Sequence, residues 1–202
     1  MLKIFILAIS LGWVIPAPAP TPSVINSLQE GGYILYARHG EATIGSDQEQ
    51  LILGDCSTQR NLSAEGKRQA VAYGENLRRL AIPIQYPVAV SPLCRTTETA
   101  ELAFGKQNVQ QEPLLENIST LSSDTPPMDQ KRVLAELTSI LEVIPPAGKN
   151  KVIIGHGFPK GVGLGDIPYM GTVMLKPRGK GKGYDVIGTI SLAEWMNMRI
   201  LN

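Results

Sequence analysis

Apolar residues along the chain fall alternately into short runs and into helical spacing. Runs with the length and composition of buried strands occur at 33–37, 88–90, 151–155, 172–175 and 184–190. Helical spacing predicts helices over 64–80, 92–104 and 128–143, and a short last helix after Ser191. Strands that alternate with helices predict an α/β fold, a three-layer α/β/α sandwich with a mostly parallel central sheet.

Capping residues set the expected ends of these helices. Ser63 is a good N-cap for the first long helix. Ser91 stands before Pro92, and because proline suits the first helical position, the next helix is expected to begin there. Gly105 is expected to close that helix.

Three of the predicted strands are followed by residues suited to chemistry. Arg38-His39-Gly40 follows the first strand, Ser91 to Arg95 the second, and His156-Gly157 the third. The carboxyl ends of parallel strands meet at one edge of a sheet, where ligands usually bind. Two arginines, the two histidines of the chain and a helix N-terminus are therefore expected to share one crevice, and such groups suit a phosphate.

One histidine is expected to do more than bind. A neutral imidazole is a competent nucleophile at phosphorus, and neighbouring arginines disfavour its protonated form. Gly40 and Gly157 would let the main chain approach a ligand closely. A lone histidine beside a strand is more often structural, but the same placement twice favours a site. Because no His or Cys cluster supplies a third zinc ligand, leaving only a carboxylate for that place, we expect no metal and no cofactor.

Composition and charge exclude some functional classes. The chain has 202 residues, of which 43% are hydrophobic and 18% charged, as in a globular domain with a sizeable core. The formal net charge is +1, which gives no electrostatic case for binding nucleic acid.

Residues 1–23 are typical of a targeting segment. Lys3 precedes an apolar run over 4–15, and a Pro-rich spacer follows it. This pattern predicts a signal peptide or an N-terminal membrane anchor, with an N-terminal buried helix as the alternative. The expected location is therefore periplasmic or extracellular, the folded domain is expected over 24–202, and membrane contact is expected only through an uncleaved N-terminal segment.

Cys56 and Cys94 are the two cysteines of the chain. In an exported protein such a pair permits one disulfide, but the sequence does not show whether the two sulfur atoms approach each other. A catalytic thiol would need a nearby base, and no histidine is close in sequence to either. A structural role is therefore favoured.

The segments at the strand ends resemble those of the histidine phosphatase superfamily, which has the phosphoglycerate-mutase-like fold. Residues 37–43 resemble its first signature, 91–100 its second arginine segment and 155–157 its second histidine, while 55–63 is similar to a segment of exported bacterial members. The resemblance implies that His39 is the nucleophile that becomes phosphohistidine. It also implies that Arg38, Arg95 and His156 hold the phosphoryl oxygens, beside Gly40.

A carboxylic acid in this family commonly protonates the leaving oxygen. Leu114-Leu115-Glu116 resembles the segment that supplies it in the mutase branch, which makes Glu116 the candidate general acid, with Glu41 second. The residues after Glu116 depart from that branch, however. This departure argues against a mutase.

The resulting hypothesis is a metal-independent phosphomonoesterase of the histidine acid phosphatase type. The alternatives are a catalytically silent anion-binding or interaction module and a phosphoglycerate-mutase-like phosphotransferase. The expected partner is a small phosphorylated substrate, such as an envelope sugar phosphate, and no nucleic acid. The basic loop at 176–183 would steer such a substrate or would be a solvated hairpin tip.

Overall fold

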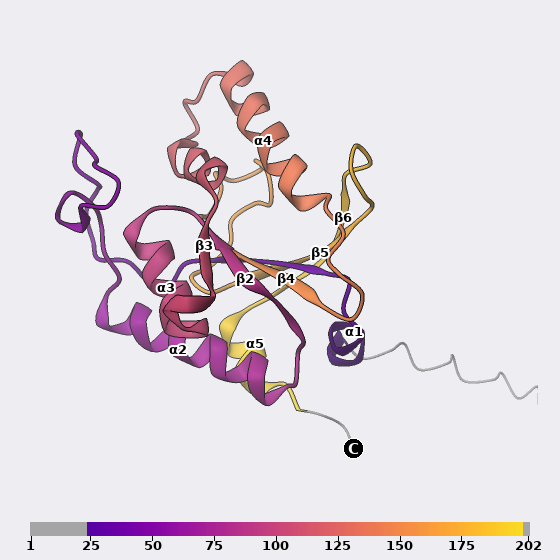
Figure 1. Ribbon diagram of the computed structural model, residues 1–202. Helices are drawn as coiled ribbons and strands as arrows, with labels where there is room; N and C mark the ends of the chain where they lie inside the picture. The colour runs from indigo at the N-terminus through magenta and orange to yellow at the C-terminus, as the bar shows by residue number, and fades with distance from the viewer. Residues whose placement is uncertain (1–23, 200–202) are drawn as a thin grey trace, which may run out of the picture.

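A computed structural model describes residues 24–199 and shows one six-stranded sheet between two layers of helices (Figure 1). The predicted targeting segment, residues 1–23, lies outside the described residues. The strands are β1 (Ile34–Arg38), β2 (Ile84–Val90), β3 (Val109–Gln111), β4 (Asn150–Gly155), β5 (Thr172–Pro177) and β6 (Tyr184–Ile190). The three-layer α/β/α sandwich expected from the sequence is confirmed.

The sheet order is β3-β2-β4-β1-β5-β6. Pairings β2–β3, β2–β4 and β1–β4 are parallel, whereas β5 runs antiparallel to both β1 and β6. The mostly parallel sheet is therefore confirmed. Strand β3 was not predicted, because its three residues include no buried position and form no apolar run.

The α-helices are α1 (Val24–Glu30), α2 (Ala64–Arg79), α3 (Cys94–Phe104), α4 (Pro127–Leu141) and α5 (Leu192–Asn197). Short 3-10 helices occur as η1 (Cys56–Thr58), η2 (Lys106–Asn108) and η3 (Pro113–Thr120). Helix α2 begins as predicted, because the side chain of Ser63 accepts a hydrogen bond from the Gly66 N–H. No helix within 24–199 combines the length and apolar character that crossing a bilayer requires.

The predicted start of α3 at Pro92 is wrong. The helix begins at Cys94, and its N-cap residue, Leu93, makes no side-chain capping bond. Instead Gln59, from a distant loop, accepts a hydrogen bond from the Cys94 N–H through its Oε1 atom at 2.8 Å. The Ser91 hydroxyl is therefore not used as a cap and is available for another contact.

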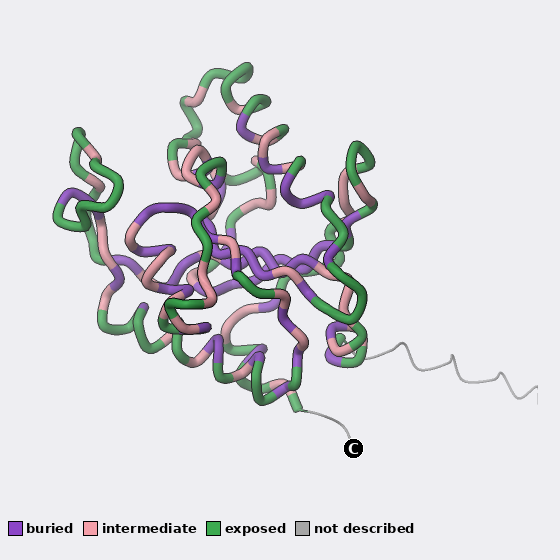
Figure 2. The backbone as a smooth tube through the Cα atoms, viewed as in Figure 1, coloured by how far each residue is buried: buried purple, intermediate pink, exposed green. Residues whose placement is uncertain are grey.

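The apolar core is divided by the sheet into two clusters. Alternate residues of β1 point to opposite faces, so Leu35 and Ala37 join one cluster while Ile34 and Tyr36 join the other. Helices α2, α3 and α5 cover the first face and α4 covers the second, with the buried residues concentrated in the sheet between them (Figures 1 and 2). This packing fixes the carboxyl ends of β1, β4 and β2 at one edge.

Helices α2 and α3 cross at very close range. A Cβ atom on Gly74 of α2 would overlap the carbonyl oxygen of Ala103 of α3, and a Cβ atom on Gly66 would overlap the carbonyl oxygen of Glu41. Helix α2 is therefore pressed against α3 near its middle and, at its first turn, against the segment that follows β1.

Candidate active site

Three strand ends bring the predicted residues into one cavity of about 430 Å³. Arg38 is the last residue of β1 and His39 follows it, His156 follows β4, and Arg95 lies in the first turn of α3, beyond β2. All four side chains line this cavity, together with Arg60 and residues of the 118–123 and 156–166 segments. Since β2, β4 and β1 are parallel neighbours, the convergence follows from the sheet topology.

His39 is buried and held in one tautomer. Its Nδ1 atom lies 2.7 Å from the Gly40 carbonyl oxygen. Because a carbonyl oxygen only accepts, Nδ1 carries the proton and Nε2 keeps its lone pair. Burial lowers the pKa of His39 to about 3, opposed by the bond to Gly40 and assisted by the positive charges of Arg95, Arg38 and Arg60. The imidazole is therefore neutral at neutral pH.

His156 faces His39 across the cavity, with ring centroids 5.5 Å apart. Its Nε2 atom lies 2.8 Å from the Ser91 Oγ, and its backbone N–H and carbonyl both bond to the Tyr36 hydroxyl, at 3.0 and 2.8 Å. Burial, followed by the effects of His39 and the arginines, holds the pKa of His156 well below its usual value. The contact made by Ser91 was not predicted, because the sequence suggested a helix cap for that residue.

Each of the two arginines is anchored by a hydrogen bond from its Nη1 atom. Arg38 donates from Nη1 to the Ile167 carbonyl oxygen at 2.8 Å, and its guanidinium lies 4.2 Å from the ring centroid of Tyr169. Arg95 donates from Nη1 to Asp47 Oδ1 at 2.9 Å. In both residues Nε is buried and has no hydrogen-bond partner among residues 24–199. An unpaired buried donor is costly, so both groups are suited to a bound anion.

Gly40 lies behind His39 and does not line the cavity. Its N–H donates to Thr99 Oγ1 at 3.1 Å, and a Cβ atom there would press on Gly66 of α2. The close approach that Gly40 permits in this structure is therefore to a helix.

The candidate acids are placed differently from one another. Glu116 is half-buried in η3 and is not among the residues that line the cavity, and Glu41 accepts a hydrogen bond from the Ser63 hydroxyl at 2.7 Å. Asp166 is exposed and does line the cavity. The sequence did not single it out, because the 156–171 segment carries no apolar periodicity. Among residues 24–199, no group of three His, Cys, Asp or Glu side chains is placed to hold a metal ion.

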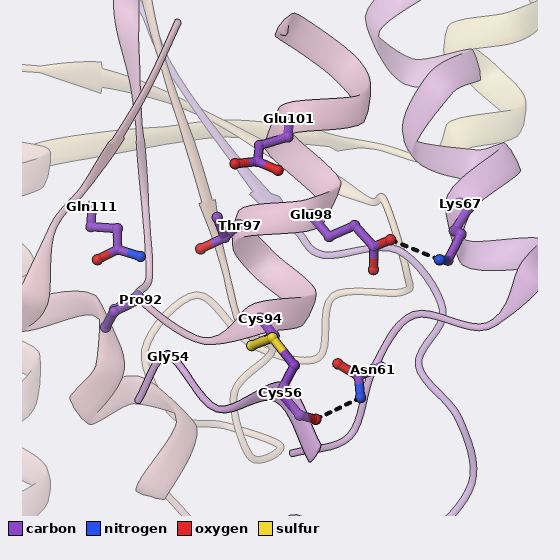
Figure 3. Close-up of a pocket in the computed structure, with 10 residues that line it drawn as sticks. All are labelled: Gly54, Cys56, Asn61, Lys67, Pro92, Cys94, Thr97, Glu98, Glu101 and Gln111. Carbon is purple, nitrogen blue, oxygen red and sulfur yellow. Dashed lines mark hydrogen bonds and ion pairs between the residues drawn. A yellow bond between two sulfur atoms is a disulfide. The ribbon is translucent and has the colours of Figure 1, made fainter. Parts of the chain in front are cut away.

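A second, larger hollow of about 540 Å³ lies beside the start of α3 (Figure 3). Cys56 and Cys94 form a disulfide at its wall, and Lys67 and Glu98, which also line it, form an ion pair at 2.8 Å. No histidine or arginine lines this hollow, so it lacks the groups expected to bind a phosphate. The cysteines have the structural role favoured from the sequence.

Comparison with family models shows which family the chain belongs to. Residues 34–134 match the model of the histidine phosphatase superfamily (branch 1). The chain therefore belongs to the histidine phosphatase superfamily. This superfamily contains phosphatases and mutases. Membership in it supports a phosphatase-type activity on a small phosphorylated substrate. No curated protein matches the chain.

Several solved structures share the fold, which is phosphoglycerate-mutase-like. The protein histidine phosphatase SixA, complexed with tungstate, is 18% identical, with 80% of this chain and 97% of that chain covered and a TM-score of 0.51. A mycobacterial hydrolase is 16% identical, with 78% and 97% covered and a TM-score of 0.51. A phosphoserine phosphatase from Entamoeba histolytica is 14% identical, with 80% and 98% covered and a TM-score of 0.49. At these identities, the likeness to the first two structures shows the fold alone.

Proposed function

We propose that this protein hydrolyses phosphomonoesters through a phosphohistidine intermediate at His39. The observation that carries the proposal is the neutral His39, with Nε2 free, beside two guanidinium groups whose buried Nε atoms have no partner among the described residues. A candidate nucleophile and candidate donors for the phosphoryl oxygens therefore line one cavity, which supports the proposal.

The reaction proceeds in two displacements. His39 Nε2 attacks phosphorus, a P–N bond forms, and the P–O bond to the alcohol breaks with its electron pair leaving on oxygen. A water then attacks the phosphohistidine: its oxygen bonds to phosphorus, the P–N bond breaks with its electron pair returning to Nε2, and a proton of the water passes to the carboxylate that protonated the leaving oxygen. Inorganic phosphate is released and the neutral imidazole is restored. Arg38, Arg95 and His156 hold the non-bridging oxygens, where charge is spread in the transition state.

The leaving oxygen takes a proton in the first displacement, and two carboxyl groups are candidates to supply it. Glu116 is proposed from the family resemblance, whereas Asp166 is proposed because it lines the cavity. Loss of the true acid slows alkyl phosphates, which have poor leaving groups, far more than aryl phosphates. Comparison of Glu116→Gln with Asp166→Asn on both substrate types identifies the donor, and an equal effect of either change on both types excludes that residue.

The alternatives predict other outcomes. A silent anion-binding module would bind phosphate without turnover, although such a module gains nothing from a desolvated, neutral imidazole. A phosphoglycerate-mutase-like phosphotransferase would pass the phosphoryl group to a second hydroxyl. Release of inorganic phosphate in stoichiometric yield distinguishes hydrolysis from transfer.

The experiment that tests the proposal is acid-quenched and base-quenched labelling with a radioactive phosphomonoester. A phosphohistidine is labile to acid and stable to base, so label is expected after the base quench in wild type and not in His39→Ala, which also loses turnover. Arg95→Ala is expected to retain the nucleophile and to slow turnover by about a hundredfold or more. Full activity in His39→Ala, or activity that EDTA removes, would refute the mechanism.

We also propose that the protein is exported and that an envelope sugar phosphate is a candidate substrate. The support is the pattern of residues 1–23. Cell fractionation with N-terminal sequencing tests the location, and a cytoplasmic chain that begins at residue 1 or 2 would refute it. The basic loop at 176–183 joins β5 to β6 at the sheet edge opposite the cavity (Figure 1). It is therefore not proposed to steer the substrate.

A further inference from the structure

We propose that Asp47 is a positioning residue for Arg95, holding the guanidinium so that its Nε edge faces the phosphate. The inference deepens the proposed function and rests on it, because the ligand of Arg95 is taken to be a phosphoryl group. Neither the apolar pattern nor the family resemblance pointed to Asp47.

The contact between the two residues is sheltered from water. Asp47 Oδ1 accepts from Arg95 Nη1 at 2.9 Å, and the same oxygen accepts from the Arg60 backbone N–H at 2.7 Å. The side chain of Arg95 is 6% exposed and that of Asp47 25% exposed. An ion pair with this burial is screened little, so it constrains the guanidinium more than a surface pair would.

Asp47 is itself held by the loop that connects β1 to α2, residues 43–61. Inside the loop, Gln48 N–H donates to the Thr58 carbonyl at 2.9 Å, and the Gln59 side chain donates to the Ile52 carbonyl at 3.1 Å.

The loop is fastened to the first turn of α3 by the bond from Cys94 N–H to Gln59 and by the Cys56–Cys94 disulfide (Figure 3). Asp47 and Arg95 are therefore fixed in one frame, although 48 positions separate them in sequence.

The pairing decides which part of the guanidinium remains for a ligand. Nη1 of Arg95 is occupied by Asp47, just as Nη1 of Arg38 is occupied by the Ile167 carbonyl. In each residue the unpartnered Nε is left on the other side. The Nε side of a guanidinium offers parallel N–H groups that match two oxygens of a phosphate. In both arginines the Nε edge is therefore the one left for an anion.

A carboxylate next to an anion site also has a cost, because its negative charge repels a phosphate. Geometry and charge therefore act in opposite directions, which makes two substitutions informative. Asp47→Ala removes the acceptor and frees the guanidinium, whereas Asp47→Asn keeps an acceptor and removes the charge. The amide oxygen is expected to stay in place of Oδ1, since both of its partners are N–H donors.

The test is calorimetric binding of inorganic phosphate to the full chain at pH 7.5. Asp47→Ala is expected to weaken binding by about tenfold or more, and Asp47→Asn to bind at least as tightly as wild type. Glu49→Ala is the matched control, because Glu49 is an exposed carboxylate of the same loop. The affinity of this variant for inorganic phosphate is expected to equal that of wild type. Partial unfolding would lower the number of binding sites and not the affinity, so the dissociation constant separates positioning from stability.

The outcomes that overturn the proposal are specific. Phosphate binding by Asp47→Ala as tight as by wild type would mean that Asp47 does not orient Arg95. Weaker binding by Asp47→Asn than by wild type would mean that charge is required, and this variant decides the question alone if Asp47→Ala does not fold. Phosphate binding needs no turnover, so a wild type that binds phosphate but hydrolyses no phosphomonoester refutes the proposed function and leaves this inference standing.

Discussion

At the scale of single residues, the main property of the two histidines is that both imidazole rings are neutral at neutral pH. Both are buried, and burial is the largest cause that lowers the pKa of each. The bond from His39 Nδ1 to the Gly40 carbonyl opposes this effect without overcoming it. The site thus keeps its imidazoles neutral in surroundings where arginines bring positive charge.

Stability is predicted to fall on acidification for this reason. The unfolded chain takes up a proton on each histidine below about pH 6.5, whereas folded His39 does so only near its pKa of about 3. Within that window the unfolded state binds more protons, so the free energy of unfolding decreases as pH falls. Urea unfolding of wild type and His39→Asn at pH 7.5 and pH 5 measures the effect, and a smaller decrease is expected in the variant. An equal decrease in both proteins would show that His39 titrates normally.

At the scale of elements, the helix starts that depend on a neighbouring residue were predicted from the sequence. The helix start that depends on a distant residue was not. The starts of α2 and α5 follow Ser63 and Ser191, whose side chains cap the N–H groups three residues later. The start of α3 was misplaced because its external acceptor, Gln59, lies 35 positions away. No pattern within a single segment reveals such a partner.

The residues of the candidate site also divide into those that the sequence pattern predicted and those that only the folded structure shows. Arg38, His39, Arg95 and His156 stand at strand ends, and parallel strands bring such positions together. Asp47 and Asp166 lie in irregular segments without periodicity, so only the folded chain shows that they reach the site. The family resemblance supplied Glu116 as the acid, whereas the cavity is lined by Asp166.

Substitutions at two glycines of α2 can distinguish the packing of this helix against α3 from its support of the candidate site. A Cβ atom on Gly66 or Gly74 would overlap a backbone carbonyl, of Glu41 and of Ala103 respectively. Alanine at either position is therefore expected to destabilise the fold by roughly 1–3 kcal/mol. Only Gly66→Ala is expected to lower the activity of the folded protein, because Glu41 continues the chain from His39. Thermal unfolding and turnover of both variants test this, and equal turnover in the two would contradict it.

At the scale of the whole molecule, the disulfide joins the 43–61 loop to α3 across a sequence separation of 38 residues. Closing a loop of this length in the unfolded chain is worth about 3–4 kcal/mol. Reduction is therefore expected to lower the melting temperature of wild type, while the Cys56→Ser/Cys94→Ser double variant should melt at one temperature with or without reductant. A reductant effect of the same size on both proteins would show that the disulfide is not its target.

The place of α1 has a consequence for how the molecule can be mounted on a surface. Helix α1 precedes β1 and lies at the amino end of the strand, whereas His39 follows its carboxyl end, so the five residues of β1 separate them by about 17 Å (Figure 1). A support bonded at the start of α1 would therefore lie at the amino end of β1, the end of the sheet away from the cavity. Protein coupled to beads at this end should keep its catalytic rate even on bulky phosphate esters. Coupling through a cysteine placed at Ser123, which lines the cavity, should obstruct the same substrates.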